Sequence, residues 1–311
     1  MRFSIIIPLY NKGQYISKTL ESLFKQTFQD FEVIVVNDGS TDNGPSLVNQ
    51  VADERVKLIC QVNQGVSVAR NTGVKHAVGD FLVFLDADDL YLDNALEHFS
   101  FLIDRFPAHD YFCANYYRVS NGVRKTAIDV DKILGKDFKY GAVDNFFYIA
   151  SFHPGSFPCN VSTFTIRRER LIERDIYFPE GVSHTEDVYF CSVLALNFFP
   201  VFSRQCVHEY YINNIGNSRS SRPTDTRFVI DELRKKTDED KYISSFIAKN
   251  IIHLLYNCIE FNDFANYKKH KRDGFFSLRF MLGKYKYHYF ILRFLPYVVA
   301  RKLYSLAKKK R

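Results

Sequence analysis

The chain has 311 residues, enough for one large or two modest domains, and 46% hydrophobic with 25% charged residues is an ordinary globular composition. No apolar run reaches the length of about 18 residues that a membrane-spanning helix needs, and the run ending at Pro8 is too short for a signal peptide. The net charge of +7 is unevenly spread, because 14 Lys or Arg and one acid lie between Lys268 and Arg311. This basic end predicts an anionic partner, either membrane lipid or nucleic acid, unless it is a solvated tail.

The cysteines form no C-x-x-C pair, and several lie in apolar runs; they are Cys60, Cys113, Cys159, Cys191, Cys206 and Cys258. This pattern favours buried free thiols over a zinc site or a disulfide framework. Free thiols are typical of a reducing compartment, so the sequence predicts a cytoplasmic protein.

The first hundred residues alternate between short apolar runs and segments with helical spacing. The apolar runs predict strands at 3–10, 31–38, 56–62 and 80–86. Helices are predicted at 15–24, after Asp42, at 66–77 and after Asp93, with the two aspartates as N-caps. The alternation predicts an α/β fold, Rossmann-like, with a mostly parallel sheet and helices on both faces. Burial of both faces explains why the strands are continuously apolar.

The pattern is weaker in the second half of the chain. Residues 110–119, 162–168 and 200–213 are strand-like, and an apolar helix is predicted to carry Glu186 and Asp187 in its first turn. A polar loop is expected at 213–225, followed by helices that become aromatic and basic. We therefore predict a catalytic domain over 1–220 and a helical, basic region over 221–311.

Polar residues follow each of the four predicted N-terminal strands. The sequence FLVFLDADD (81–89) sends an apolar run directly into Asp86, Asp88 and Asp89. Carboxylates this close raise one another's pKa, so a positive charge is expected beside them. Ligands of open α/β sheets bind beyond the carboxyl ends of the strands, where these acids lie. Each acid taken alone is also compatible with an ordinary turn or helix cap.

Five motifs then occur in order: SIIIPLYN (4–11), VVNDGSTD (35–42), NQGVSVARNTG (63–73), GDFLVFLDADD (79–89) and HTEDVYF (184–190). Together they resemble family 2 glycosyltransferases, which have the GT-A fold, over roughly residues 1–215. The chain has no Trp, so the Q-x-x-R-W motif of processive synthases is absent. The resemblance therefore implies a non-processive bacterial-type enzyme of glycan assembly that moves one sugar from a nucleotide-sugar, expected to be a UDP-sugar, with inversion.

The resemblance implies a metal site and a donor site. Asp88 matches the metal-binding acid of the D-x-D motif, and carboxylate oxygens suit Mg²⁺ or Mn²⁺. Asp38 matches the acid that accepts a hydrogen bond from the N3–H of uracil. Arg70 is expected either to neutralise phosphate or to pair with an aspartate of the acidic loop. The residues implied to bind the nucleotide-sugar are Pro8, Tyr10, Asn11, Asp38, Arg70, Asn71, Asp86 and Ala87.

The resemblance also assigns the base. Asp187 matches the carboxylate that takes a proton from the acceptor hydroxyl. Glu186 is a further candidate for acceptor binding, although two acids also favour a helix N-terminus by themselves. Ile212 stands where a basic lid residue is common in the family, so His208 or Arg219 is expected to contact the diphosphate instead.

The basic end is expected to bind an anionic membrane surface. Val299, Leu303 and Leu306 share one helical face from Tyr297 onward, with basic residues opposite. We therefore expect a peripheral protein on the inner face of the cell membrane, with a glycan or lipid-linked acceptor and no nucleic acid partner, because no nucleic-acid-binding motif is present. A sugar nucleotidyltransferase and a non-catalytic sugar-nucleotide-binding assembly protein are the alternatives.

Overall fold

The computed structural model describes residues 1–152, 158, 160–182, 184–211, 228–235 and 240–309. The chain divides into two compact units. The first comprises Met1–Phe146 and Phe157–Gly216, and the second comprises Phe147–Ser156 and Asn217–Arg311. The expected boundary at residue 220 falls outside the described residues, so the domain limits 1–220 and 221–311 stay predictions.

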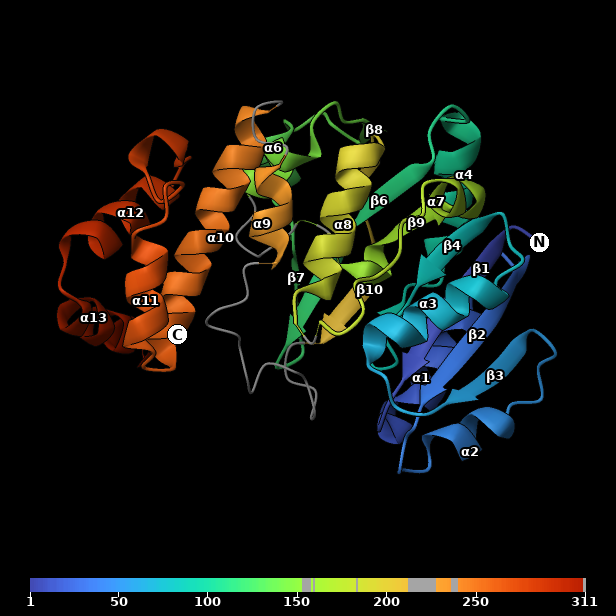
Figure 1. Ribbon diagram of the computed structural model, residues 1–311. Helices are drawn as coiled ribbons and strands as arrows, with labels where there is room; N and C mark the ends of the chain where they lie inside the picture. The colour runs from blue at the N-terminus through green and yellow to red at the C-terminus, as the bar shows by residue number, and fades with distance from the viewer. Residues whose placement is uncertain (153–157, 159, 183, 212–227, 236–239, 310–311) are drawn as a thin grey trace. The chain divides into compact units, whose positions relative to one another are not determined.

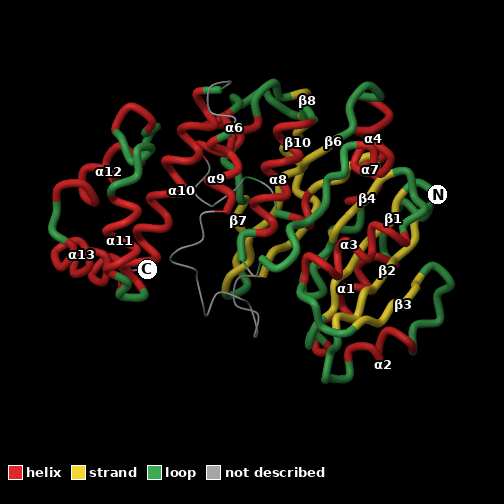
Figure 2. The backbone as a smooth tube through the Cα atoms, in the orientation of Figure 1, coloured by secondary structure: helices red, strands yellow, loops and turns green. Residues whose placement is uncertain are grey.

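The first unit is built on a ten-stranded mixed sheet with the order β3-β2-β1-β4-β9-β6-β10-β5, in which β7 pairs with β6 and β8 with β10 (Figures 1 and 2). Strands β1 to β4 form a parallel set in which β1 lies between β2 and β4. The strands are β1 (Phe3–Leu9), β2 (Phe31–Asp38), β3 (Val56–Gln61), β4 (Phe81–Phe84), β5 (Leu90–Tyr91), β6 (Tyr111–Ser120), β7 (Val123–Thr126), β8 (Tyr140–Ala142), β9 (Phe164–Arg167) and β10 (Val201–Tyr211).

Helices cover both faces of the parallel set, as the alternation predicts. The helices before residue 200 are α1 (Gly13–Phe24), α2 (Gly44–Asn49), α3 (Val66–His76), α4 (Ala95–Arg105), α5 (Val130–Ile133), α6 (Phe146–Phe152), α7 (Arg168–Glu173) and α8 (Glu186–Asn197). Alternate residues of β1, such as Ile5 and Ile7, join a core with α1 and α4. Ile6 points to the opposite face, where Gly73 lets α3 approach closely. The predicted α/β fold is confirmed.

Two details of the prediction are wrong. Neither Asp42 nor Asp93 is an N-cap, because α2 and α4 begin one residue later, after Asn43 and Asn94, and neither of these caps a backbone N–H with its side chain. The side chain of Asp42 instead accepts bonds from Gly44 and, across to α1, from Gly13. The acid therefore ties two segments together where local sequence suggests only a cap.

The second unit is helical around the long α10. Its main helices are α9 (Phe228–Arg234), α10 (Lys241–Glu260), α11 (Phe264–Lys271), α12 (Tyr285–Phe294) and α13 (Tyr297–Lys309). The buried face of α10 contacts α9, α11, α12 and α13. Within the described ranges, no helix combines the length and the apolar character needed to cross a bilayer.

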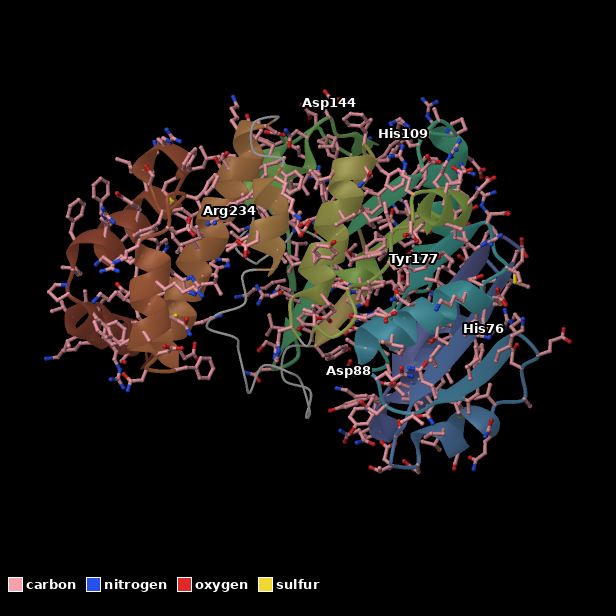
Figure 3. All side chains as sticks on the ribbon, in the orientation of Figure 1. His76, Asp88, His109, Asp144, Tyr177 and Arg234 are labelled. Atoms are coloured by element: carbon pink, nitrogen blue, oxygen red, sulfur yellow. The ribbon has the colours of Figure 1, made fainter. Side chains whose placement is uncertain are left out.

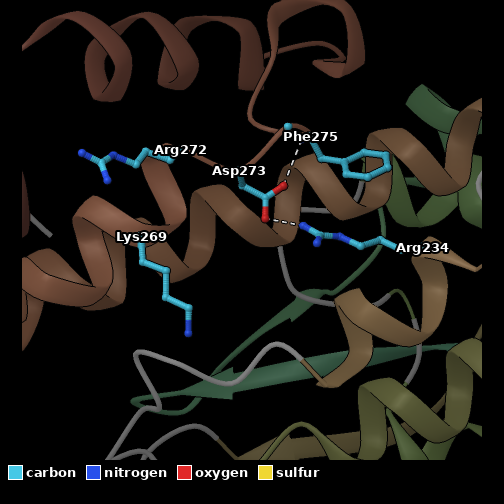
Figure 4. Close-up of a pocket in the computed structure, with 6 residues that line it drawn as sticks. Arg234, Lys269, Arg272, Asp273 and Phe275 are labelled. Carbon is cyan, nitrogen blue, oxygen red and sulfur yellow. Dashed lines mark hydrogen bonds and ion pairs between the residues drawn. The ribbon is translucent and has the colours of Figure 1, made fainter.

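A shallow cavity of about 360 Å³ in the second unit is lined by Arg234, Lys269, Arg272, Asp273, Gly274 and Phe275 (Figure 4). The guanidinium of Arg234 forms an ion pair with the buried carboxylate of Asp273. That carboxylate also accepts a 3.0 Å bond from the backbone N–H of Phe275. The ion pair joins α9 to the turn after α11, so its role in the structure of the second unit accounts for it.

The described cysteines are free thiols, as expected, but not all are buried. Cys113, Cys191 and Cys258 are buried, whereas Cys206 is half-buried and Cys60 is exposed on the edge strand β3. Cys159 lies outside the described residues. Edge strands keep one side open to solvent, which explains the exposure of Cys60.

Candidate active site

The parallel register brings the ends of β1, β2 and β4 to one edge of the sheet, where Asp88 lies (labelled in Figure 3). Asn11 follows β1 with a φ of 51°, a left-handed conformation that Asn tolerates better than most residues. Its side-chain oxygen accepts a 2.8 Å bond from the N–H of Thr41, and its own N–H donates to the hydroxyl of Ser40 at 3.1 Å. The loops after β1 and β2 are therefore fixed to each other.

The carboxylate of Asp38 lies at the end of β2 and is almost fully buried. One oxygen accepts bonds from the side chain of Gln61 (2.8 Å) and the N–H of Gln64 (2.9 Å), and the other accepts one from Gly65 (2.8 Å). A carboxylate has about four acceptor positions, so these three bonds leave capacity for one further donor. On the neighbouring strand β1 Pro8 is partly buried, and Tyr10 directly after that strand is half exposed, which leaves both able to contact a ligand.

The acidic loop after β4 is held in place by two hydroxyl groups. The hydroxyl of Ser162 accepts a 3.3 Å bond from the N–H of Asp86 and donates a 3.1 Å bond to the carboxylate of Asp89. Thr19 of α1 donates to the carbonyl of Ala87 at 2.9 Å, and the Ala87 methyl group is buried. Ala87 therefore shapes the loop, and its side chain is not exposed to a ligand in this structure.

Each carboxylate of the loop contacts one basic side chain. The pairs are Asp86 with Arg70 at 2.7 Å, Asp88 with Lys12 at 2.6 Å, and Asp89 with His208 at 2.9 Å. Arg70 and Lys12 thus supply the positive charge that was expected beside the acids.

The Asp89–His208 pair is interior. Burial raises the pKa of Asp89 to about 6, against the lowering effect of His208 beside it. The side chain of His208 has 0% exposure and lies between the rings of Tyr91 and Tyr116. This position disagrees with the expected lid contact, because a fully buried ring does not reach a bound diphosphate. The structure instead indicates that His208 positions Asp89.

Arg70 connects the acidic loop to Glu186, the residue next to the candidate base Asp187. Its guanidinium lies 2.7 Å from Asp86 and 3.4 Å from Glu186, stacks over Phe178 at 5.0 Å, and has a side chain only 4% exposed. Although burial opposes the charged form, the carboxylates of Asp86 and Glu186 raise the pKa of Arg70. Of the two roles expected for Arg70, pairing with the acidic loop is the one that this geometry supports.

Glu186 and Asp187 begin α8 and lie in the same charge cluster. Burial and the neighbouring charge of Asp187 raise the pKa of Glu186 to about 7, against the lowering effect of Arg70. Burial also raises the pKa of Asp187, although its bond from the N–H of Val188 (2.8 Å) opposes this. The preceding Thr185 has a φ of 66°, which is rare for a β-branched residue and typical of functional sites.

Asn71 is engaged by the protein. Its amide donates to the carbonyl of Phe178 (3.0 Å) and to Glu180 (3.1 Å), and its oxygen accepts from the N–H of Phe178 (2.9 Å). These contacts disagree with the expected ligand contact, because the buried amide is already bonded to protein. Asn71 holds the segment that supplies the ring under Arg70.

The residues around Asp88 fit a metal ion that takes most of its ligands from water and from the phosphates of the substrate. No cluster of three or more His, Cys, Asp or Glu able to hold a metal occurs among the described residues. Mg²⁺ and Mn²⁺ sites that bind phosphates commonly use one or two carboxylates, with water and phosphate oxygens completing the shell. The Asp88 carboxylate already holds a cation, the ammonium of Lys12, so it fits this role.

Two site residues were missed from the sequence, and one expected residue is not placed. Arg219 lies outside the described residues. Lys12 directly follows the Tyr10–Asn11 motif, which is a signal that sequence reasoning could have used. Ser162 gave no signal, because only the pairing of β9 with β4 brings it to the loop.

The profile of glycosyl transferase family 2 matches residues 4–175. This match covers more than half of the chain, so the protein belongs to glycosyl transferase family 2. The resemblance stated from the five motifs is confirmed.

Two relatives illustrate the extent of similarity. YibD, an uncharacterized glycosyltransferase of Escherichia coli (strain K12), is 28% identical over 230 residues, 71% of this chain and 64% of YibD. The glycosyltransferase GlyG of Streptococcus pneumoniae serotype 4 is 30% identical over 179 residues, 56% of this chain and 57% of GlyG. The chain thus matches less than two thirds of the length of either relative.

Solved structures share the fold. A crystal structure of S. aureus TarS 1–349 in complex with UDP-GlcNAc gives a TM-score of 0.72 at 21% identity, covering 100% of this chain and 93% of that one. The mannosyltransferase PcManGT from Pyrobaculum calidifontis, in complex with GDP-Man and Mn²⁺, gives 0.57 at 18% identity, covering 99% and 88%. At these identities the similarity shows the α/β, GT-A-like fold alone.

Proposed function

We propose that this family 2 protein is a metal-dependent, inverting glycosyltransferase. It transfers a single hexose-type sugar from a nucleotide-sugar, with UDP as the nucleotide, to a glycan or lipid-linked acceptor in cell-surface polysaccharide assembly. The observation that carries this proposal is the chain of contacts from Asp86 through Arg70 to Glu186, because it links the acidic loop to the residue next to the candidate base Asp187. The UDP-GlcNAc complex of TarS and the Mn²⁺ complex of PcManGT support it by analogy.

Asp38, Asp88 and Asp187 each have one task in the proposed reaction. Asp38 accepts the N3–H of uracil with its remaining acceptor position. Asp88 holds Mn²⁺ or Mg²⁺, which when bound stabilises the negative charge of the leaving diphosphate. Asp187 accepts the proton of the acceptor hydroxyl while that oxygen bonds to the anomeric carbon and the bond from this carbon to the diphosphate oxygen breaks. General-base help of this kind contributes about 10²–10⁴-fold in rate.

The raised pKa of Asp187 suits a base, because a carboxylate with higher proton affinity takes the hydroxyl proton more readily. Glu186 lies beside it and is the candidate for binding an acceptor hydroxyl. Both acids lie in the first turn of α8, where the partial positive charge of the helix N-terminus favours a carboxylate.

The test is a binding and hydrolysis screen over UDP-, GDP- and TDP-sugars with and without Mn²⁺. Wild type is expected to bind one UDP-sugar and hydrolyse it slowly. Asp88→Asn should lose metal-dependent binding, whereas Asp187→Asn should bind the donor normally and lose about 10²–10⁴-fold in turnover. Absence of sugar-nucleotide binding by wild type in the presence of metal would overturn the proposal.

Nucleotidyl transfer is less well supported. It needs a Gly-rich basic loop that wraps a triphosphate. The loop after β1 has Gly13, whose N–H is bonded to Asp42 at 2.7 Å and which has no room for a Cβ beside Asn43. A loop closed against its own chain in this way is a poor phosphate cradle.

We further propose that α12 and α13 attach the protein to an anionic membrane surface. Phe294 and Val298 are 70% and 74% exposed, and Phe290 stacks on Phe294. Exposed basic residues flank them, including Lys284, Lys286, Arg293, Arg301 and Lys302. Val299 and Leu303 are both exposed and lie one helical turn apart, whereas the side chain of Leu306 is outside the described set. Apolar and basic groups together suit the interface of an anionic bilayer.

A further inference from the structure

The ion pair between Lys12 and Asp88 occupies the carboxylate to which the proposed function assigns the metal. The ammonium lies 2.6 Å from one Asp88 oxygen, and the two side chains are only 18% and 13% exposed. A pair this sheltered is screened less than a surface pair, so it competes effectively with another cation.

Lys12 is presented by a fixed backbone. It is the N-cap residue of α1, and the residues on either side are pinned: Asn11 to Thr41, and Gly13 to Asp42. Only the four-carbon side chain of Lys12 can then move. An ammonium makes no bidentate contact that would fix the position of this side chain. The head of the side chain is therefore a tethered charge beside a rigid loop.

The other two basic side chains that contact the acidic loop are more deeply buried than Lys12. The side chains of Arg70 and His208 are 4% and 0% exposed, whereas that of Lys12 is 18% exposed and also lies over the ring of Tyr15. The loop is also tied to α1 by the bond from Thr19 to Ala87, which does not involve Lys12. Lys12 is thus the cation that can leave without dismantling the loop.

We propose that Lys12 is an exchangeable counterion that competes with the divalent metal for Asp88. In the absence of donor, the ammonium of Lys12 balances the negative charge of the Asp88 carboxylate. The donor brings a diphosphate with further negative charge, and a divalent cation then replaces the ammonium, which remains close enough through its stem to interact with the same anion. Lys12 is a positioning residue here, and the inference rests on the proposed function because it takes Asp88 as the metal ligand.

The decisive probe is Mn²⁺ alone, titrated into the full chain and followed by the electron paramagnetic resonance signal of free Mn²⁺. Lys12→Gln should bind Mn²⁺ about tenfold more tightly than wild type, equivalent to about 1.4 kcal/mol. Lys12→Arg keeps the charge and should bind Mn²⁺ as weakly as wild type. Lys18→Gln is the matched control, because Lys18 is an exposed lysine of the same helix.

A second measurement keeps the result independent of folding. Lys12→Gln leaves a sheltered carboxylate without its ammonium, so its melting temperature should fall without metal and recover more than that of wild type on adding Mn²⁺. Adding Asp88→Asn to Lys12→Gln should abolish the gain in Mn²⁺ affinity. Unchanged or weaker Mn²⁺ binding by Lys12→Gln, or an equal gain in Lys18→Gln, would overturn the proposal.

The same titration separates this inference from the proposed function. With UDP present, wild type should gain more Mn²⁺ affinity than Lys12→Gln, because only in wild type does the displaced ammonium find a new partner in the bound diphosphate. If no variant binds UDP with metal, the proposed function fails, whereas the comparison in Mn²⁺ alone still decides the role of Lys12.

Discussion

Each of the three acids after β4 contacts a basic side chain, and these side chains differ in how deeply they are buried. Asp86 and Asp89 face buried partners from α3 and β10, whereas Asp88 faces the flexible Lys12. The acids themselves are visible in the sequence. Of their partners, Arg70 was expected from the sequence and Lys12 could have been, whereas the pairing of His208 with Asp89 could not, because only the folded sheet brings the distant strand β10 to the loop.

The adjacent acids of α8 lead to a prediction about pH. As the pH falls through about 7, the pair Glu186 and Asp187 takes up a proton, so kcat/KM should fall on the acid side. Glu186→Gln removes the negative neighbour that disfavours charge on Asp187, and the acid limb should move to lower pH. The measurement is the pH profile of donor hydrolysis for both proteins.

The control for this profile is Glu169→Gln, which removes one exposed carboxylate on α7. It should leave the acid limb where it is. If the Glu186→Gln limb stays in place or moves to higher pH, the two acids do not share a proton in the way their positions indicate.

At the scale of elements, the strands were predictable because their burial is continuous. β1, β2 and β4 are buried almost throughout, and their predicted limits agree with the structure to within a few residues. β3 is half-exposed at the edge of the sheet, so its apolar run overstated its burial. The prediction of Asp42 as a helix cap failed because its side chain bonds to Gly13 in another segment. Local spacing does not encode this contact.

The contact between α3 and β1 gives a test of packing. A Cβ on Gly73 would lie 2.3 Å from a side-chain carbon of Ile6, too close for both to keep their positions. Gly73→Val should therefore lower the free energy of unfolding by about 1–3 kcal/mol, measured by urea denaturation.

The matched experiment is a double-mutant cycle with Ile6→Ala. That change alone leaves a cavity and should cost about 2–5 kcal/mol. Because it also makes room for the new side chain at Gly73, the double variant should be more stable than the sum of the single effects predicts. Simple additivity would show that α3 and β1 do not meet tightly at this point.

At the scale of the whole molecule, charge is distributed unequally between the two units. The first unit carries the acidic motifs, and the second contains the whole basic segment from Lys268 to Arg311. Composition predicted this asymmetry, and the helical character of the second unit also followed from the sequence. The placement of residues 147–152 in that unit did not, because their partners on α10 lie about a hundred residues further along the chain, as for Ser151 and Tyr242.

The charge asymmetry predicts salt-dependent binding of the full chain to vesicles that contain anionic lipid. Each basic residue near such a surface contributes about 1 kcal/mol, so Arg301→Gln with Lys302→Gln should weaken binding about thirtyfold at low salt. Lys18→Gln with Lys25→Gln removes the same charge from exposed positions on and directly after α1 and should change binding little. Cosedimentation with anionic and neutral vesicles measures both. Equal losses in the two variants would mean that net charge, and not the surface of α12 and α13, governs attachment, and binding that ignores anionic lipid would contradict membrane attachment by this surface.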